Sequence, residues 1–296
     1  MKKLIIILLS ALLLLCSCAG SEEESSQMQS SQSADMSVVS EEESNHDGET
    51  KKLVSKLTIK NETGKISQTN VYEYDSLGRT VTVVTESEQG TIYNYIGYDE
   101  NGYEAEYITK DASGNIQSHH QYERDEYGYV IKWRTLDKNG KIKNENVYDV
   151  VRDDQGRMLE VYSNGELSQY YTYDEEGNAT ERRPNSDIYN IYNKDNKTLE
   201  SGTANSKMIY TYENGLLKEI NSQNSENVYK TLFEYDGELL IARTNYENGE
   251  ITIKYTFEYD SDGDIIKETM QNALGISVSI SEYEYDYFPI EDQEEE

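Results

Sequence analysis

Short segments rich in β-branched and aromatic residues follow one another along most of this chain, and polar and apolar positions alternate within them. Residues 91–96 (TIYNYI) and 250–259 (EITIKYTFEY) alternate with a period of two, and residues 79–85 (RTVTVVT) are β-branched almost throughout. This pattern is typical of half-buried β-strands. After the first 20 residues no segment carries a helical pattern, and proline occurs only at Pro184 and Pro289. The pattern therefore predicts an all-β protein.

A recurring turn separates these segments. Residues 72–79 read Tyr-Glu-Tyr-Asp-Ser-Leu-Gly-Arg, and related Tyr-Asp turns recur with the turn residue at positions 75, 99, 125, 153, 174, 193, 213, 236, 260 and 286. Nine steps over 211 residues give a period of about 23 residues, within the range of repeat architectures. A second turn lies near the middle of most steps, as at 61–64, 111–114 and 137–140. Each repeat therefore holds two turns and two short strands.

The turns have a physical cause. Asp or Asn at the first position of a type I turn accepts hydrogen bonds from backbone N–H groups just ahead. Glycine three residues later takes a positive φ without steric cost, and a type I turn followed by such a residue is a common hairpin connection. Ten such repeats predict an antiparallel meander of about ten two-stranded units, forming a long twisted or curled sheet. At roughly 4.8 Å per strand, about twenty strands would span on the order of 95 Å.

Tyrosine dominates the aromatic composition, with 27 tyrosines against 3 phenylalanines and 1 tryptophan. In six repeats, aromatic residues stand one and three positions before the turn residue, so each pair shares one face of a strand. Stacked repeats would line these pairs into a stripe, where rings pack and hydroxyls stay wet. The stripe is a candidate ligand surface, although packing on the sheet is the simpler interpretation for any single tyrosine. The candidate residues are Tyr72, Tyr74, Tyr171, Tyr173, Tyr210, Tyr212, Tyr259, Tyr283 and Tyr285, with Phe233/Tyr235 and Phe257 completing the pairs.

The charge balance is strongly acidic. The chain carries a formal net charge of −30, and residues 51–290 keep 43 of the 57 acids and 25 of the 27 bases, a net of −18. A surface of this sign repels nucleic acid and anionic headgroups, so we expect no nucleic-acid partner. Solubility is the simplest reason for such a charge, and attraction of cationic partners or divalent ions is the alternative.

The N-terminus predicts export and anchoring. A basic start, an apolar run at residues 4–15 and a small-residue boundary describe a secretory signal peptide over residues 1–17. Leu15-Cys16-Ser17-Cys18 resembles the lipobox of bacterial lipoproteins, which makes Cys18 the lipidated residue. A plain secretion signal with incidental cysteines is the alternative. On the lipoprotein reading Cys16 is removed, and the mature chain has no second cysteine with which to form a disulfide.

Three further regions follow from composition. Residues 18–50 are expected to form a lipidated, disordered acidic tether, because almost nothing in them can be buried to offset the entropy of ordering. Residues 51–290 form the β-repeat domain, and residues 291–296 form an acidic tail.

Candidate chemistry is sparse. Asp260, Asp262 and Asp264 alternate like acids of a calcium loop, but the glycine and the bidentate glutamate of an EF-hand are not at the required positions. His119 and His120 are adjacent, so on a strand they point to opposite faces and cannot chelate one ion together. Carboxylates are abundant, yet nothing in the sequence singles out a pair for hydrolysis. For Trp133, a packing role is a simpler interpretation than a role as a ligand anchor. We therefore expect no catalytic residues, no metal and no cofactor.

The Tyr-x-Tyr-Asp-x-x-Gly-Arg segment at 72–79, repeated with a period in the low twenties, resembles the YD repeat of the RHS family. The likeness covers about residues 51–288 and is weakest between 182 and 230, where glycine turns are replaced and the sheet is expected to bend or loosen. The resemblance implies an all-β meander that can spiral. Large members of the family enclose a toxin in a hollow shell, and other relatives display the repeats at cell surfaces.

Together these features predict a lipid-anchored protein of the bacterial cell envelope, facing away from the cytoplasm. Its expected role is a non-catalytic binding or structural platform, attached to the membrane through its N-terminal lipid. Cell-wall polymers, host glycans or proteins are the candidate partners. The alternatives are an envelope hydrolase that acts through carboxylates, and an accessory or immunity component of an RHS-type toxin system.

Overall fold

The computed structural model describes residues 50–184 and 186–290. Across these residues the chain forms twenty β-strands and no helix, which confirms the all-β prediction. The predicted signal peptide, Cys18, most of the tether and the acidic tail lie outside the described residues. The strands are β1 (Thr50–Asn61), β2 (Ile66–Tyr74), β3 (Thr80–Ser87), β4 (Gly90–Tyr98), β5 (Glu104–Asp111), β6 (Ile116–Arg124), β7 (Val130–Leu136), β8 (Ile142–Arg152), β9 (Met158–Ser163), β10 (Glu166–Tyr173), β11 (Ala179–Arg182), β12 (Tyr189–Tyr192), β13 (Thr198–Gly202), β14 (Lys207–Glu213), β15 (Leu216–Gln223), β16 (Val228–Asp236), β17 (Leu239–Glu247), β18 (Glu250–Tyr259), β19 (Ile265–Asn272) and β20 (Ser277–Pro289).

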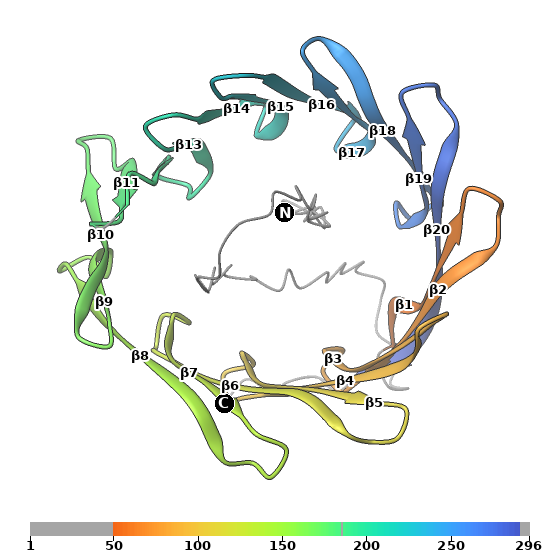
Figure 1. Cartoon of the computed structure of the whole chain (residues 1–296), viewed down its shortest axis with the longest axis horizontal. Coiled ribbons are helices and arrows are strands. Elements are labelled where there is room, and N and C mark those ends of the chain that lie inside the picture. The colour runs from red at the N-terminus through yellow and green to blue at the C-terminus, as the bar shows by residue number, and fades with distance from the viewer. Residues whose placement is uncertain (1–49, 185, 291–296) are drawn as a thin grey trace. The chain divides into compact units, whose positions relative to one another are not determined.

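Every strand pairs antiparallel with its neighbours in sequence, as expected for a meander, and all twenty belong to one sheet. The first strand also pairs with the last one, from Thr50 opposite Pro289 to Asn61 opposite Ser279. The strands therefore form the continuous ring seen in Figure 1. The sequence led us to expect a long twisted or curled sheet, and the structure corrects this to a closed one. At roughly 4.8 Å per strand, a sheet of about 95 Å closes at a diameter of roughly 30 Å before strand tilt is considered.

Closure removes both free edges of the sheet, which explains why twenty strands form a stable arrangement. An open sheet of this width would leave two rows of unpaired backbone N–H and C=O groups at its edges. The pairing of β1 with β20 satisfies these groups over almost the whole length of both strands. This seam joins residues more than 200 positions apart in the chain.

The hairpin turns follow the predicted geometry. At the first Tyr-Asp turn the Gly78 N–H donates to the Asp75 carbonyl (3.0 Å), and the Asp75 N–H donates to the Arg79 carbonyl (2.9 Å). Gly78 has a φ of +74°, and one Asp75 carboxylate oxygen accepts the N–H groups of Leu77 and Arg79. The same backbone pattern recurs at the turns that begin with Asn61, Asp99, Asp111, Asp125, Asp137, Asp153, Asp174, Asn193, Asp260 and Asn272.

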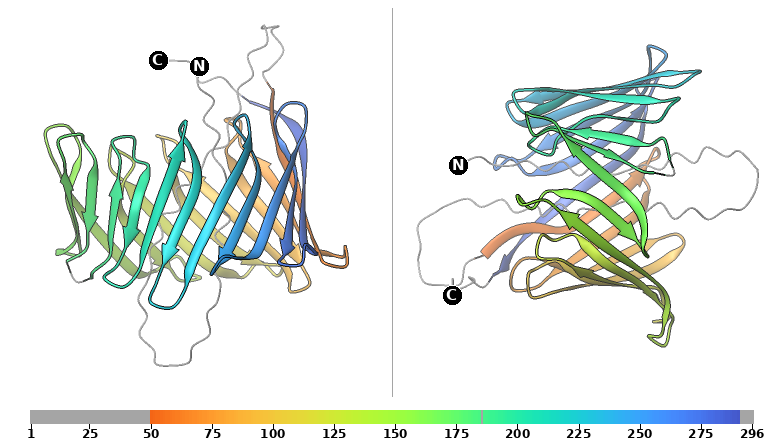
Figure 2. Two further views of the ribbon diagram at one scale, coloured as in Figure 1. Left: turned by 90° about the horizontal axis from the view of Figure 1, so that it is seen from above. Right: turned by 90° about the vertical axis from the view of Figure 1, so that its left-hand side faces the viewer.

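The turns divide between two rims, which Figure 2 shows from the side. One edge of the ring holds the turns after the even-numbered strands, together with the start of β1 and the end of β20. We call this edge the Tyr-Asp rim. The edge that holds the turns after the odd-numbered strands is the far rim. All Tyr-Asp turns lie on the first of these because they recur once every two strands.

The two faces of the sheet differ in character. Tyr72 and Tyr74 share one face of β2 with Tyr283 and Tyr285 of β20, and we call it the tyrosine face. The opposite face carries ion pairs such as Lys56–Glu284 (2.6 Å). Few side chains among the described residues are fully buried, as the tyrosine-rich composition suggested. The buried apolar residues are Leu53, Val161, Phe233, Leu240, Ala242 and Tyr255.

The segment with the weakest repeat pattern contains the shortest strands. β11 and β12 have four residues each, and β13 has five. The ladder of pairs nevertheless continues through them without a gap. No helix in the described part of the chain has the length and hydropathy needed to span a bilayer.

Candidate functional site

The tyrosine directly before the turn residue is a structural hydrogen-bond donor. Tyr74 donates its hydroxyl to the Val54 carbonyl at 2.7 Å, and Tyr259 donates to the Leu240 carbonyl at 2.7 Å. Each acceptor lies on the preceding strand, close to the same rim. The prediction that the tyrosine hydroxyl stays hydrated is therefore wrong at these positions, because the hydroxyl donates a hydrogen bond that links one Tyr-Asp turn to its neighbour. The same bond is made by Tyr98 to Thr80, Tyr173 to Met158, Tyr235 to Leu217 and Tyr285 to Ile265.

Arginine replaces this tyrosine in two repeats and keeps the rim bonded. The Arg124 guanidinium donates to the Gly128 carbonyl (3.0 Å) and, more weakly, to the Glu104 carbonyl at the start of β5 (3.4 Å). Arg152 donates to the Gly156 carbonyl (3.0 Å) and pairs with Asp125 of the preceding turn (2.8 Å). Both substitutions preserve a donor at the position where tyrosine supplies one.

Cations lie over several tyrosine rings of the same rim. The Arg79 guanidinium is 4.4 Å from the centre of the Tyr98 ring, Arg157 is 4.4 Å from Tyr173, and Lys197 is 5.5 Å from Tyr212. A cation over a ring within about 6 Å is attracted by the ring quadrupole. These rings are partly covered, so the rim offers less open aromatic surface for a ligand than the sequence suggested.

The aromatic residue three positions before the turn residue lies deeper in the sheet. Burial raises the pKa of Tyr72, and burial followed by the nearby Glu268 raises the pKa of Tyr283 to about 12. Tyr283 and Tyr72 belong to strands on either side of β1, and Tyr72 adds to the raised pKa of Tyr283. At the seam, the aromatic pairs of β2 and β20 therefore share one face of the sheet. Tyr171 and Tyr210 hold the equivalent positions in β10 and β14.

A buried carboxylate lies on the tyrosine face of the short strands. Glu181 is 7% exposed and stands opposite Tyr171 on β10 and Asn190 on β12. It accepts hydrogen bonds from the Tyr192 hydroxyl (2.9 Å) and the Asn190 amide (3.2 Å). Burial, and then the Glu181 carboxylate, raises the pKa of Tyr171 far above its usual value. No local sequence pattern marks this group, and only the register of β10 and β11 identifies it.

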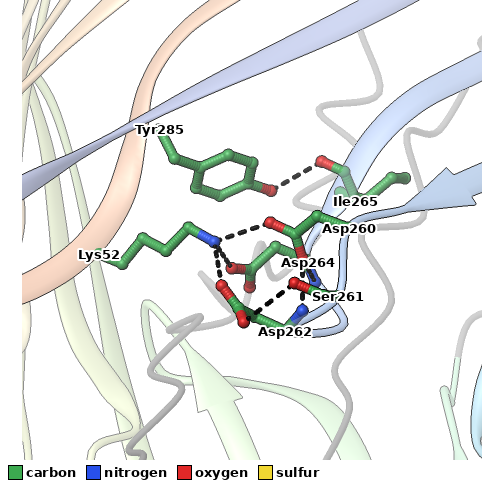
Figure 3. Close-up of polar contacts among 7 residues, drawn as sticks. All are labelled: Lys52, Asp260, Ser261, Asp262, Asp264, Ile265 and Tyr285. Atoms are coloured by element: carbon green, nitrogen blue, oxygen red, sulfur yellow. Dashed lines mark hydrogen bonds and ion pairs between the residues drawn. The ribbon is translucent and has the colours of Figure 1, made fainter.

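Lys52 joins the first strand to the ninth Tyr-Asp turn (Figure 3). Its ammonium contacts Asp260 at 2.7 Å, Asp262 at 2.8 Å and Asp264 at 2.8 Å, all on the turn between β18 and β19. It also lies 5.4 Å from the centre of the Tyr285 ring on β20. One side chain of β1 thus reaches past β20 to the next hairpin, and we call this group the Lys52 clasp.

The same three aspartates are the residues whose spacing suggested a calcium loop. Their carboxylate oxygens lie within 4.8 Å of one another, so the geometry alone could hold a cation. The Lys52 ammonium already supplies a positive charge to all three. Burial opposes ionisation of Asp260, but Lys52 and the N–H groups of Asp262 and Asp264 outweigh it and lower its pKa. The cluster is therefore a set of ion pairs within the chain in this structure.

The adjacent histidines point to opposite faces, as the sequence predicted. His119 lies opposite Ile108 and its Nε2 contacts the Glu106 carboxylate at 2.8 Å. His120 lies opposite Tyr107 and is parallel to the Trp133 indole, with ring centres 5.9 Å apart. Trp133 therefore packs against another side chain of the sheet.

Apart from the aspartates paired with Lys52, the described part of the tyrosine face carries shielded carboxyl groups that lie far from one another. Burial raises the pKa of Glu104 on β5 and of Glu268 on β19, and nearby Arg124 and Arg243 partly oppose these shifts. Glu181 on β11 is the third. Six strands separate Glu104 from either of the others, which corresponds to roughly 29 Å along the sheet. Glycosidases hold their two carboxyls about 5–10 Å apart.

Comparisons with known proteins show only limited similarity to this chain. No protein-family model matches the sequence, and neither does any curated protein. A solved structure described as TcdB2-TccC3-TEV matches 73% of this chain and 16% of its own, with 13% identity and a TM-score of 0.32. Porin-like proteins from Bacteroides uniformis and Bacteroides vulgatus match 79% of this chain and 98% of theirs, with identities of 14% and 12% and TM-scores of 0.35 and 0.36. The chain spans about a sixth of the first of these structures, and nothing about its function follows from TM-scores this low.

Proposed function

We propose that this chain is a lipid-anchored YD-repeat protein of the bacterial cell envelope that acts as a non-catalytic binding or structural platform. The observation that carries the proposal is the wide separation of Glu104, Glu181 and Glu268, three shielded acids of the tyrosine face. The closely spaced aspartates of the Lys52 clasp are already paired with Lys52. Each of these three glutamates lies among aromatic rings, and neither of the other two is close enough to act with it as an acid–base pair. Such an arrangement suits polar contacts to a bound partner better than paired acid–base chemistry.

The rigidity of the closed sheet supports the same proposal. Rim tyrosines bind neighbouring turns, cations cover their rings, and the Lys52 clasp holds the seam. A scaffold without free sheet edges presents a stable surface and resists association through strand pairing. These properties are useful to a protein exposed outside the cell.

The anchor is tested by Cys18→Ala. If Cys18 carries lipid, the variant is released into the medium or stays unprocessed, because an acyl anchor supplies the membrane affinity that the signal peptide loses on cleavage. Fractionation of cells followed by mass spectrometry of the N-terminus measures both outcomes. Membrane retention of a processed Cys18→Ala form would refute the anchor.

The non-catalytic role is tested with the full-length protein and a panel of cell-wall polymers and host glycans. We expect no release of reducing ends from any of them, and recovery of a specific partner after crosslinking on intact cells. Hydrolysis that disappears in Glu104→Gln, Glu181→Gln or Glu268→Gln would instead establish the envelope hydrolase.

A further inference from the structure

A half-open pocket lies at the far rim, between the ends of β6, β7 and β8. Its volume is about 220 Å³. With roughly 30 Å³ for each water molecule in the liquid, it has room for about seven waters or one small ring. The lining residues are Gln117, Ser118, His119, His120, Thr135, Leu136, Lys143 and Asn144.

Several residues that line this pocket have buried side-chain polar atoms without a hydrogen-bond partner. Among the described residues, four side-chain N or O atoms are buried without a hydrogen-bond partner, and three of them belong to lining residues: His119 Nδ1, His120 Nδ1 and Thr135 Oγ1. The fourth is Arg243 Nε, on β17. His119 points to the opposite face of the sheet from His120, so His120 Nδ1 and Thr135 Oγ1 are the two that can share one place. Buried polar groups nearly always have partners, so this pair calls for a cause.

Two of the orphaned atoms face the same way. His120 and Thr135 are direct cross-strand partners, and Asn144 is the partner of Thr135 on the next strand. Their side chains therefore form one row on the tyrosine face of β6, β7 and β8. The His120 ring is held parallel to the Trp133 indole, and burial followed by the neighbouring His119 lowers the pKa of His120. A neutral imidazole at this place offers both a donor and an acceptor.

The lining chemistry indicates the class of ligand. None of the eight lining residues is acidic, although residues 51–290 have a net charge of −18. Hydroxyl, amide and imidazole groups predominate, and these pair well with the hydroxyls of a polyol. Orphaned neutral donors and acceptors in a small pocket are satisfied by a hydroxylated ring at little electrostatic cost.

We propose that the pocket at His120 and Thr135 binds one hydroxylated ring, a single sugar residue of a surface glycan. The ring hydroxyls would pair with His120 Nδ1 and Thr135 Oγ1, while Asn144 and Ser118 supply further polar contacts. This inference rests on the proposed role as a binding platform and names the class of partner that the platform holds.

Saturation-transfer NMR on the full-length protein tests the inference. The protein is kept in a detergent without a sugar headgroup, and glucose, galactose, N-acetylglucosamine and glucuronic acid are the probes. We expect saturation transfer to at least one of them. Thr135→Val should weaken that binding about tenfold, since it removes one hydrogen bond to the ligand and preserves the β-branched shape.

The stability of the same variant separates a binding role from a structural one. Because Thr135 Oγ1 has no partner in the free protein, Thr135→Val should leave the melting temperature unchanged or raise it. A lower melting temperature would show that the hydroxyl supports the fold and would overturn its assignment to a ligand. Thr85→Val in β3 is the matched control and should leave sugar binding unchanged.

Two outcomes would overturn the proposal while sparing the proposed function. The first is no saturation transfer to any sugar, in a protein that still depends on Cys18 for retention at the envelope. The second is equal sugar binding by the wild type, Thr135→Val and His120→Phe, which would indicate a site elsewhere. Ordered water alone at His120 and Thr135 in crystals soaked with the sugars would agree with either of these results.

Discussion

At the scale of single residues, the two aromatic positions found in six of the repeats have different roles. The position directly before the turn residue needs a donor, because its side chain satisfies a backbone carbonyl on the preceding strand. The position three residues before the turn residue has no such requirement: it holds a ring in some repeats and Ile96 or Val150 in others. This difference explains why Phe233 and Phe257 occur at the second position, while tyrosine or arginine holds the first in every repeat where the turn begins with Asp.

Tyr285→Phe tests this division. It removes the hydroxyl that donates to the Ile265 carbonyl at 2.8 Å, leaving a partly buried acceptor unpaired. The expected loss is about 1 kcal/mol in the free energy of unfolding. Tyr283→Phe on the same strand is the matched control and should change stability by only a few tenths of that amount. Urea unfolding followed by circular dichroism measures both, and equal losses would contradict the division.

At the scale of the elements, the turns carry the strongest local information. Gly128 and Gly140 occupy the same turn position with the same φ of +78°, a region that glycine enters without strain. Their surroundings differ. A Cβ at Gly140 would meet nothing within 4 Å, whereas one at Gly128 would lie 2.8 Å from the Tyr103 ring. Gly128 therefore has two reasons to be glycine, and Gly140 has one.

Alanine at each position separates the two reasons. Gly140→Ala should cost about 1 kcal/mol, the strain of a left-handed residue with a Cβ. Gly128→Ala should cost about 1 kcal/mol more, because the Tyr103 ring must leave the place where Arg124 lies over it at 5.7 Å. Thermal unfolding of the two variants checks the order. A larger loss for Gly140→Ala would contradict the role assigned to Tyr103.

At the scale of the whole molecule, closure depends on the seam between β1 and β20. The Lys52 clasp strengthens this seam because it connects β1 with the turn between β18 and β19, two strands beyond it. The side chains of Lys52 and Asp264 are 22% and 14% exposed, so the contact is partly shielded from water. Partly buried ion pairs contribute more than the near-zero value of exposed ones.

Lys52→Met should lower the free energy of unfolding by about 2 kcal/mol at neutral pH, since three aspartates lose their common cation. The pKa of Asp260 is lowered in the folded state, so its contribution is present above its unfolded value of about 4 and is lost as pH falls through the folded value. The pKa of Lys52 is raised, so its contribution is present below its unfolded value of about 10.5 and is lost as pH rises through the folded value.

The difference between wild type and Lys52→Met should therefore stay constant from about pH 5 to 10 and shrink below about pH 4. Lys56→Met is the control, because it removes one exposed pair with Glu284 and should cost at most a few tenths of a kcal/mol. Urea unfolding across pH measures the profile. An undiminished difference at pH 3 would refute the electrostatic origin of the clasp.

Several features could be predicted from the sequence because their causes are local. Asp and Gly three residues apart specify a turn through their own backbone preferences, so the hairpins at Asp75 and Asp260 were predictable. The opposite directions of His119 and His120 follow from the two-residue period of a strand. Of the candidate site, the aromatic pairs were predictable for the same reason, whereas the use of the Tyr259 hydroxyl required knowledge of its acceptor.

By itself, the sequence determined the all-β fold, the antiparallel meander, the turn positions and the shared face of each aromatic pair. Only the tertiary structure decided that the sheet closes, that Lys52 contacts Asp260 across 208 residues, and that His120 and Thr135 meet in one pocket. The first group depends on interactions within a few residues. The second depends on the register and twist accumulated over many strands, which no short stretch of sequence encodes.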